Sequence, residues 1–238
     1  MGLDKHGLLT SRTIQAHCTF LSPSDLSRIH ERGTAIAHCP LSNAYFSAEI
    51  FRLREALDEG VKVGLGTDIA GGYSADIMNT MRQAVVVSRL RQGRETIRKI
   101  NQDRPLKTEE QDPQRNLAID WKEALYLATK GGATALGLNS GSFEVGAPFD
   151  AQMSESSLAN IYDQSLIRRP MSHNKKPRYW RGSRYPRLFL GTLDFFSDDI
   201  TVTEAVVEKW WCAGDERNRG FVWVQGCVRK QRSACTIG

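Results

Sequence analysis

The run Val61-Lys62-Val63-Gly64-Leu65-Gly66-Thr67-Asp68 decides the fold class of this chain. Its first six residues form a short apolar stretch, which predicts a buried strand with Asp68 just beyond its C-terminal end. Two earlier stretches, residues 13–17 and 34–37, have the same strand-like character. The sequence therefore predicts three short strands at regular spacing in its first seventy residues.

A helix is predicted after each of these strands. Ser22-Pro23-Ser24-Asp25 begins the first helix, which runs to Glu31 and has an early proline and an acidic first turn. Residues 47–59 and about 75–91 have the pattern of the second and third. Repeated β–α units of this kind give a parallel sheet with helices outside it. Three units are too few for a closed eight-stranded barrel, which takes about 250 residues. The predicted fold class is therefore α/β, with a partial TIM-like (β/α) barrel.

The rest of the chain contains fewer clear elements. Asp120 and Glu123 have the spacing of a capping box at the start of a helical region that runs to Leu138. Further predicted elements are a polar loop or frayed helix at 92–116, a short strand within 146–152, a helix at 203–212 and a strand at 220–229 of a small β layer. The predicted domains are the partial barrel at 1–140, a small composite β region with a C-terminal helix at 141–153 and 203–230, and an atypical, disordered basic insertion at 154–199.

The positive charge of the chain is concentrated in one segment. The formal net charge is +5, but residues 166–187 contain eight basic residues and no acidic ones. The rest of the chain has 24 basic and 27 acidic residues, a net charge of −3. With Tyr179, Trp180 and Tyr185 among its cations, the segment has the composition of a nucleic-acid-binding arm. We favour instead an unstructured insertion or a mispredicted coding sequence, so nucleic acid is not an expected partner.

The composition indicates a globular protein without a membrane anchor. No run reaches the roughly 18 consecutive apolar residues of a membrane span, and residues 1–6 have no stretch of the signal-peptide type. The five cysteines include no Cys-x-x-Cys pair, which fits free thiols in a reducing compartment. We therefore expect a cytoplasmic protein with no membrane partner.

Three polar residues, His17, His38 and Asp68, stand at the C-terminal ends of the predicted strands. Active sites of α/β barrels are built at that face, so these side chains are expected to converge there. Hydrolytic zinc sites use histidine and carboxylate ligands, and a spare carboxylate accepts protons. Two alternatives stay open: His38 as a core residue, and Asp68 as the N-cap of the helix that begins near Ser74.

Several motifs carry a resemblance to a known family. They are Ala37-His38-Cys39-Pro40, Gly64 to Ser74, Ala128 to Leu138, Phe143-Glu144-Val145-Gly146 and Gly214-Asp215-Glu216-Arg217-Asn218. Together with Ala16-His17, they resemble the guanine deaminases, which belong to the aminohydrolase branch of the amidohydrolase superfamily. The resemblance covers residues 8 to about 152 and about 203 to 230. It places the three strand-end residues on the sixth, seventh and eighth strands, so the partial barrel corresponds to about the last three β/α units.

The resemblance implies a zinc-dependent hydrolase that converts guanine and water to xanthine and ammonia in guanine catabolism, with one Zn²⁺ per active site. Asp68 corresponds to the aspartate that binds the metal and takes a proton from the attacking water. His17 corresponds to a histidine near the metal that polarises the attacking group or the substrate without being a main ligand. His38, with Cys39 and Pro40, is expected to shape the end of its strand. The resemblance also implies a homodimer.

The sequence departs from the family pattern in its histidines. No two of its five histidines are two positions apart, and none precedes a His-x-x-Glu arrangement at a strand end. A catalytic zinc site needs about three protein ligands, which Asp68 alone does not supply. We therefore expect the chain to correspond to the C-terminal half of a family member and to be inactive by itself. The alternative is a non-catalytic protein that keeps the partial barrel for binding or assembly, with a basic arm for nucleic acid.

Overall fold

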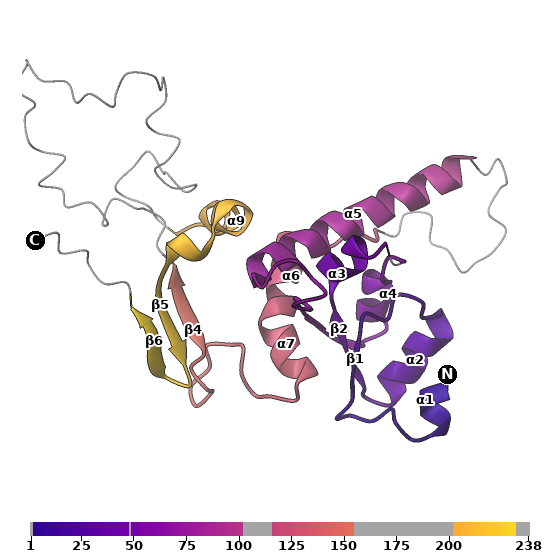
Figure 1. Cartoon of the computed structure of the whole chain (residues 1–238), viewed down its shortest axis with the longest axis horizontal. Helices are drawn as coiled ribbons and strands as arrows, with labels where there is room; N and C mark the ends of the chain where they lie inside the picture. The colour runs from indigo at the N-terminus through magenta and orange to yellow at the C-terminus, as the bar shows by residue number, and fades with distance from the viewer. Residues whose placement is uncertain (1, 48, 102–115, 155–201, 232–238) are drawn as a thin grey trace, which may run out of the picture. The chain divides into compact units, whose positions relative to one another are not determined.

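The computed structural model describes residues 2–47, 49–101, 116–154 and 202–231. It divides the chain into two compact units, Met1–Pro148 and Phe149–Gly238. Each unit has a three-stranded sheet (Figure 1). The atypical segment predicted at 154–199, with its basic stretch, lies outside the described residues apart from Ser154, the last residue of a strand.

A parallel sheet forms the centre of the first unit. Its strands, in spatial order, are β1 (Ile14–Ala16), β2 (Ala35–His38) and β3 (Lys62–Leu65). Ile36 in the middle strand pairs with Gln15 on one side and Val63 on the other. Because all three strands run in the same direction, their carboxyl ends lie at one end of the sheet. The three predicted strands and their parallel arrangement are confirmed.

Helices occupy most of the remaining described part of this unit. They are α1 (Gly2–Lys5), α2 (Pro23–Glu31), α3 (Pro40–Tyr45), α4 (Leu53–Asp58), α5 (Ile77–Asn101), α6 (Trp121–Ala128) and α7 (Lys130–Ala135). The capping box predicted at Asp120 and Glu123 forms at the start of α6, where the two residues exchange side-chain and backbone hydrogen bonds. Ser22 and Asp25 form a second capping box at the start of α2, where the sequence predicted a helix start from its early proline and acidic first turn. These bonds satisfy backbone N–H groups that the first helical turn leaves unpaired.

The helix predicted at 47–59 is shorter than expected. It begins only at Leu53, while Ser47 has a φ of 54°, outside the right-handed helical region. A separate short helix begins earlier, at Pro40, where a proline fits because the first helical turn needs no N–H donor. The apolar pattern still identified the buried face, since Leu53 and Ala56 are almost fully buried.

Of the polar loop or frayed helix predicted at 92–116, the first ten residues are helical, because α5 continues to Asn101. The added turns are polar, so they lack the apolar period from which a helix is predicted. Local contacts hold them instead: the Thr96 hydroxyl donates to the Gln92 carbonyl at 2.9 Å, and Arg98 pairs with Glu95 at 3.4 Å. Pairs three or four residues apart stabilise a helix without burying apolar area.

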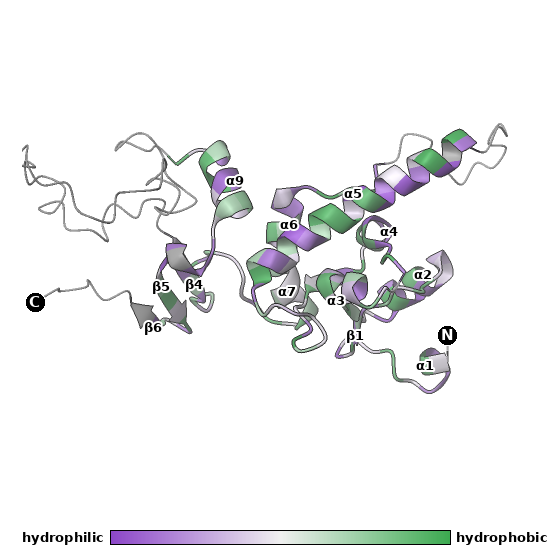
Figure 2. Ribbon diagram, turned by 45° about the horizontal axis from the view of Figure 1, so that its top comes forward, coloured by the Kyte–Doolittle hydropathy of each residue, from purple (hydrophilic) through white to green (hydrophobic). Residues whose placement is uncertain are grey.

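One apolar side of α5 is exposed. Val86, Leu90, Ile97 and Ile100 are between 48% and 70% exposed. Figure 2 shows apolar and polar residues alternating along this helix. No helix in the described ranges combines the length and apolar content that crossing a membrane requires.

The core of the first unit lies between the sheet and its helices. Its fully buried side chains include Leu26 and Ile29 of α2, Ile36 of β2 and Met81 of α5. Strand β3 approaches α7 closely at a pair of glycines, since a Cβ on Gly64 would lie 2.9 Å from the Gly132 Cα. A side chain at this position would push the helix away from the strand.

An ion pair joins α4 to α5. The Arg91 guanidinium forms two hydrogen bonds with the Glu55 carboxylate, one of them 2.6 Å from Nη1 to Oε2, and both side chains are mostly buried. Burial raises the pKa of Glu55, but the hydrogen bonds and charge of Arg91 outweigh it, so the net pKa is lowered from 4.5. An acid whose pKa is lowered by folding stabilises the folded state above that pH range.

We expect Glu55→Gln to lower the free energy of unfolding by about 2 kcal/mol at neutral pH, because the variant loses the charged partner of Arg91. The difference from the wild type should shrink as the pH falls below 4.5, since the native carboxylate then becomes protonated. Urea unfolding followed by circular dichroism at several pH values measures the difference in free energy of unfolding and its dependence on pH. Glu59→Gln, at an exposed neighbour, is the matched control. A difference that does not depend on pH would contradict this account.

The second unit contains an antiparallel sheet of β4 (Ala151–Ser154), β5 (Arg219–Val224) and β6 (Cys227–Gln231). Helix α9 (Glu204–Ala213) and the 3-10 turn η3 (Glu216–Asn218) precede β5. The single strand predicted at 220–229 is therefore wrong, because the chain reverses at Gln225 and Gly226, which have φ values of 50° and 76°. A two-residue turn with both φ values positive fits the twist of a hairpin.

Candidate active site

His17 and Asp68 meet at the carboxyl end of the parallel sheet. His17 directly follows β1, and Asp68 lies three residues beyond the end of β3. The His17 Nε2 atom is 3.8 Å from the Asp68 Oδ2 atom, and the two side chains are 42% and 35% exposed. The sheet thus brings together an imidazole and a carboxylate that are 51 residues apart in the sequence, at a surface that solvent reaches.

Both residues adopt the left-handed backbone conformation. The φ angle is 64° at His17 and 51° at Asp68. Residues other than glycine rarely adopt this region, and each instance costs on the order of 1 kcal/mol. The His17 N–H donates to the Ala37 carbonyl of β2 at 3.0 Å, which holds this residue against the sheet. The surrounding structure therefore holds the backbone of both residues outside the extended conformation that would continue the strand.

The loop after Asp68 depends on glycine. The Gly72 N–H donates to the Asp68 carbonyl, and a Cβ on Gly72 would collide with the Thr67 carbonyl oxygen. The alternative role of Asp68 as a helix N-cap is excluded, because α5 begins at Ile77. The Asp76 carboxylate instead accepts a hydrogen bond from the Met78 N–H at 3.2 Å. Asp68 is thus available to a ligand.

Asn43 contacts the other side of the His17 ring. Its Oδ1 atom lies 2.8 Å from His17 Nδ1, and Asn43 itself is only 6% exposed. The asparagine belongs to α3, the short helix that follows β2. Asn43 is a site residue that the sequence patterns did not predict. Its one signal was a polar side chain close behind the strand-end motif Ala37-His38-Cys39-Pro40.

His38 does not join this pair. It is the last residue of β2, is 2% exposed, and its ring packs against Phe51 with centroids 5.0 Å apart. Burial and, to a smaller extent, the nearby His17 lower the pKa of His38 to about 3. His38 Nδ1 has no hydrogen-bond partner among the described residues. A neutral, buried imidazole packs in the core and shapes the strand end.

Two thiols near the site are kept protonated by their surroundings. Burial, with a smaller contribution from Cys39, raises the pKa of Cys18 to about 11. Burial and then the charge of Asp68 raise the pKa of Cys39. The thiolate is the form that binds metals and attacks electrophiles, so neither cysteine is suited to those roles here.

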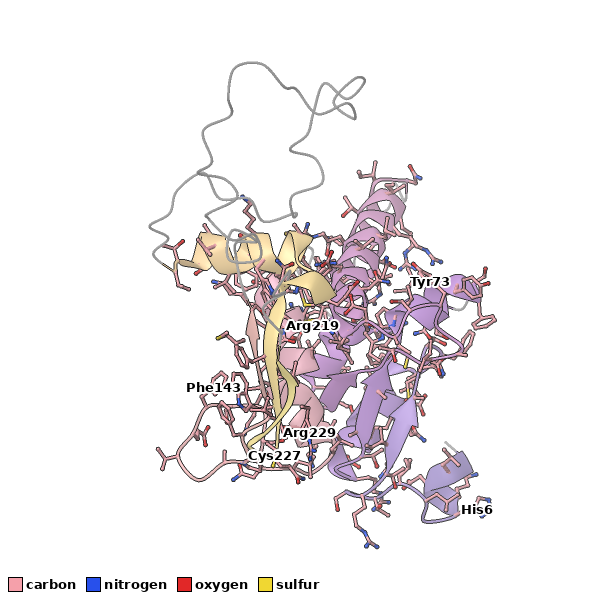
Figure 3. The ribbon with its side chains drawn as sticks, turned by 60° about the vertical axis from the view of Figure 1, so that its left-hand side comes forward. His6, Tyr73, Phe143, Arg219, Cys227 and Arg229 are labelled. Atoms are coloured by element: carbon pink, nitrogen blue, oxygen red, sulfur yellow. The ribbon has the colours of Figure 1, made fainter. Side chains whose placement is uncertain are left out.

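The remaining histidines in the described ranges lie elsewhere. His6 lies beside α1, and Figure 3 shows it far from Tyr73, which follows the Asp68 loop. His30 lies within α2, where its ring is next to Gly60. Among the described residues, no three His, Cys, Asp or Glu side chains are close enough to hold a metal ion together. Since catalytic zinc takes about three protein ligands, Asp68 and His17 by themselves do not fit a complete zinc site.

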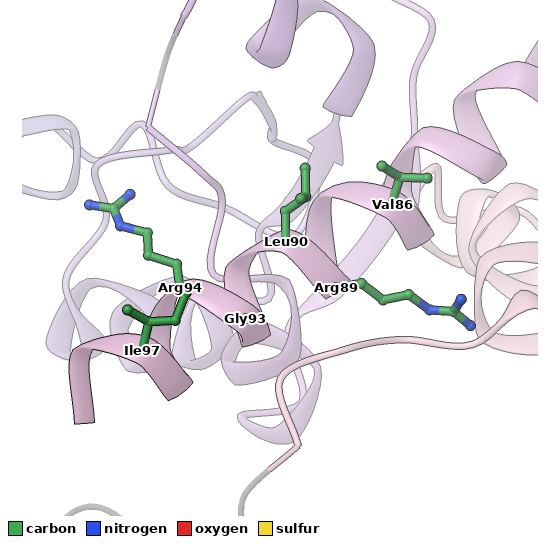
Figure 4. Close-up of a pocket in the computed structure, with 6 residues that line it drawn as sticks. All are labelled: Val86, Arg89, Leu90, Gly93, Arg94 and Ile97. Carbon is green, nitrogen blue, oxygen red and sulfur yellow. The ribbon is translucent and has the colours of Figure 1, made fainter. Parts of the chain in front are cut away.

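A separate groove runs along α5. It has a volume of about 610 Å³ and is lined by Val86, Arg89, Leu90, Gly93, Arg94 and Ile97. Figure 4 shows these residues along one helix. The lining has no acid, histidine or thiol, so the groove has no group suited to hydrolysis.

A family model describes most of the chain. Residues 2–178 match the amidohydrolase family. The chain therefore belongs to the amidohydrolase family.

Within the amidohydrolase family, the chain is similar in sequence to guanine deaminases. The chain is 37% identical over 225 residues to the guanine deaminase of Homo sapiens and 39% identical over 226 residues to that of Mus musculus. Each match covers 94% of this chain and 39% of the relative. The Escherichia coli guanine deaminase is 31% identical over 168 residues, which is 68% of this chain and 33% of the relative. The chain thus spans about two fifths of the length of the mammalian relatives.

Solved structures support the same fold. The E. coli guanine deaminase superposes with a TM-score of 0.66 at 24% identity, over 97% of this chain and 41% of that one. The guanine deaminase of C. acetobutylicum with bound guanine in the active site gives 0.63 at 23% identity, over 94% and 41%. A zinc-bound adenosine deaminase from Xanthomonas campestris gives 0.61 at 21% identity, over 97% and 39%. The family and these neighbours imply a TIM-like barrel fold.

Proposed function

We propose that this chain supplies the Asp68 and His17 part of a zinc-dependent guanine deaminase active site. Residues 1–140 would then form about the last three β/α units of a TIM-like barrel, and 141–153 with 203–230 a small β region and C-terminal helix. The observation that carries the proposal is the 3.8 Å approach of His17 and Asp68 from two strands that are not neighbours. The substrate would be guanine and the products xanthine and ammonia.

Asp68 is suited to accept a proton. Its carboxylate is partly exposed at the end of the sheet and points toward an imidazole rather than a helix terminus. General bases must lie within hydrogen-bonding reach of the proton they take, and an exposed carboxylate at the site surface meets that requirement for an attacking water. His17, which faces Asp68, would form a hydrogen bond with the attacking group or with the substrate.

The zinc requirement is proposed for the complete site. Asp68 would be one ligand, and the others would come from outside the described residues, because those residues contain no group of three ligands. The X. campestris neighbour has bound zinc, which supports this choice of metal. Because the described residues supply too few zinc ligands, we expect that the chain by itself does not turn over guanine.

The location, the oligomeric state and the alternative functions stay predictions. The four described cysteines are free, which supports a cytoplasmic location. A homodimer is proposed from the family resemblance alone. The alternative of a non-catalytic binding or assembly protein, and the nucleic-acid arm, lack a supporting observation among the described residues.

A chimaeric enzyme tests the proposed function. The segment of the mouse guanine deaminase that matches the first unit would be replaced by residues 2–148 of this chain. We expect the chimaera, loaded with zinc, to convert guanine to xanthine, because His17 and Asp68 would complete the set of groups. The isolated chain with added zinc should show no turnover. Absorbance or chromatographic assay of xanthine measures both.

The outcomes test separately the assignment of Asp68 and His17 to the site and the expected inactivity of the isolated chain. A folded, zinc-containing chimaera without turnover would contradict the assignment of Asp68 and His17 to a deaminase site. Turnover by the isolated chain would contradict the shortage of metal ligands, and metal analysis of that sample would then show stoichiometric zinc. Circular dichroism of the chimaera establishes that it folds.

A further inference from the structure

The side chain of Asn43 is held in a fixed position beside His17. It is 6% exposed, and the Asn43 N–H donates to the Cys39 carbonyl at 3.0 Å, which anchors its backbone in the first turn of α3. Its Oδ1 atom is 2.8 Å from His17 Nδ1, across 26 residues of sequence. The contact therefore joins the site to the segment that follows β2.

The contact selects one form of the neutral imidazole. An amide oxygen only accepts hydrogen bonds, so the Nδ1 atom of His17 must carry the proton. The neutral ring has one protonated nitrogen, which leaves a lone pair on Nε2. This is the nitrogen that lies 3.8 Å from Asp68 Oδ2, at the exposed face of the site.

We propose that Asn43 is a positioning residue that keeps neutral His17 in its Nδ1–H tautomer, so that Nε2 accepts a hydrogen bond in the site. The inference rests on the proposed function and refines the role of His17 there. With the Nε2 lone pair facing outward, His17 accepts a hydrogen bond from the attacking water. It does not donate one to a substrate carbonyl while it is neutral.

The opposite orientation of the Asn43 amide would favour the other tautomer of His17. If Asn43 Nδ2 faced the ring, it would donate to Nδ1 and the proton of His17 would move to Nε2. In the present orientation, Nδ2 is buried and has no hydrogen-bond partner among the described residues. The two orientations thus differ in the position of one proton, which is directly measurable.

Nitrogen NMR of the full chain tests the inference. Long-range ¹H–¹⁵N spectra at alkaline pH, where imidazoles are neutral, distinguish a protonated ring nitrogen from one with a lone pair. The signals of His17 are assigned by their loss in His17→Gln. We expect His17 to show a protonated Nδ1 and an unprotonated Nε2. A protonated Nε2 in the wild type would overturn the inference.

Two variants of Asn43 separate positioning from general packing. Asn43→Ala removes the acceptor, and the His17 proton should move largely to Nε2. Asn43→Asp keeps an oxygen at the same place and should keep the proton on Nδ1. The control is Ser42→Ala, a buried neighbour, which should leave the tautomer unchanged. An unchanged tautomer in folded Asn43→Ala would overturn the inference, and the wild-type and Asn43→Asp spectra decide it if Asn43→Ala does not fold.

Kinetics in the chimaeric enzyme adds a second readout. Asn43→Ala should lower kcat by about 10- to 100-fold, as is usual when a group that orients a site residue is lost, with little change in KM for guanine. Asn43→Asp should recover part of the rate. The NMR experiment needs neither zinc nor substrate, so a wrong tautomer overturns this inference alone. Loss of all deaminase activity in the unmutated chimaera instead contradicts the proposed function.

Discussion

Replacing Asp68 by asparagine is expected to lower guanine deamination by the chimaeric enzyme about 1,000-fold. Asparagine has almost the same shape, so the left-handed backbone at this position and the loop through Gly72 should be retained. The amide has no negative charge and does not accept a proton from water at neutral pH. The loss should therefore appear in kcat/KM without loss of the folded structure, measured by the xanthine assay and by circular dichroism.

The matched control is Asp76→Asn. Asp76 lies eight residues further along, and its carboxylate accepts the Met78 N–H at the start of α5. Asparagine caps helices about as well as aspartate, so this variant should keep its activity within a few-fold. Retention of activity within tenfold by Asp68→Asn would remove Asp68 from the catalytic machinery and leave the proposal without its proton acceptor.

Ile36→Ala should have the largest effect on stability. Ile36 is fully buried in the middle strand, between β1 and β3. The substitution removes three carbon atoms from a site that neighbours on both sides hold in place, and isoleucine-to-alanine changes in cores cost about 2–5 kcal/mol. A value near the upper end is expected, because the flanking strands limit collapse into the cavity. Urea unfolding followed by circular dichroism measures it.

Ile97→Ala is the control for that measurement. Ile97 is 60% exposed on α5, so the same loss of atoms creates no cavity there. The free energy of unfolding should change by less than about 0.5 kcal/mol, as is usual for surface substitutions. Equal effects of the two substitutions would contradict the assignment of Ile36 to a packed core.

Local sequence signals were sufficient for much of the first unit. The capping box at Asp120 is satisfied within one helical turn, so residue type and spacing alone predict it. The apolar strand at Lys62–Leu65 is equally clear. Predictions failed where a single backbone angle decided the outcome, as at Ser47 and Gln225, because several residue types adopt positive φ and the sequence does not say which will.

The candidate site, too, was predicted in part from the sequence and decided in part by the tertiary structure. The sequence by itself determined that His17, His38 and Asp68 stand at the C-terminal ends of parallel strands, and hence that they belong to one end of the sheet. Only the tertiary structure decided that His38 turns into the core against Phe51 while His17 faces Asp68 and Asn43. The physical reason is that His38 is still within its strand, whereas His17 and Asp68 lie beyond theirs in the left-handed conformation. That conformation costs free energy locally and is held by contacts distant in sequence, so no local pattern reveals it.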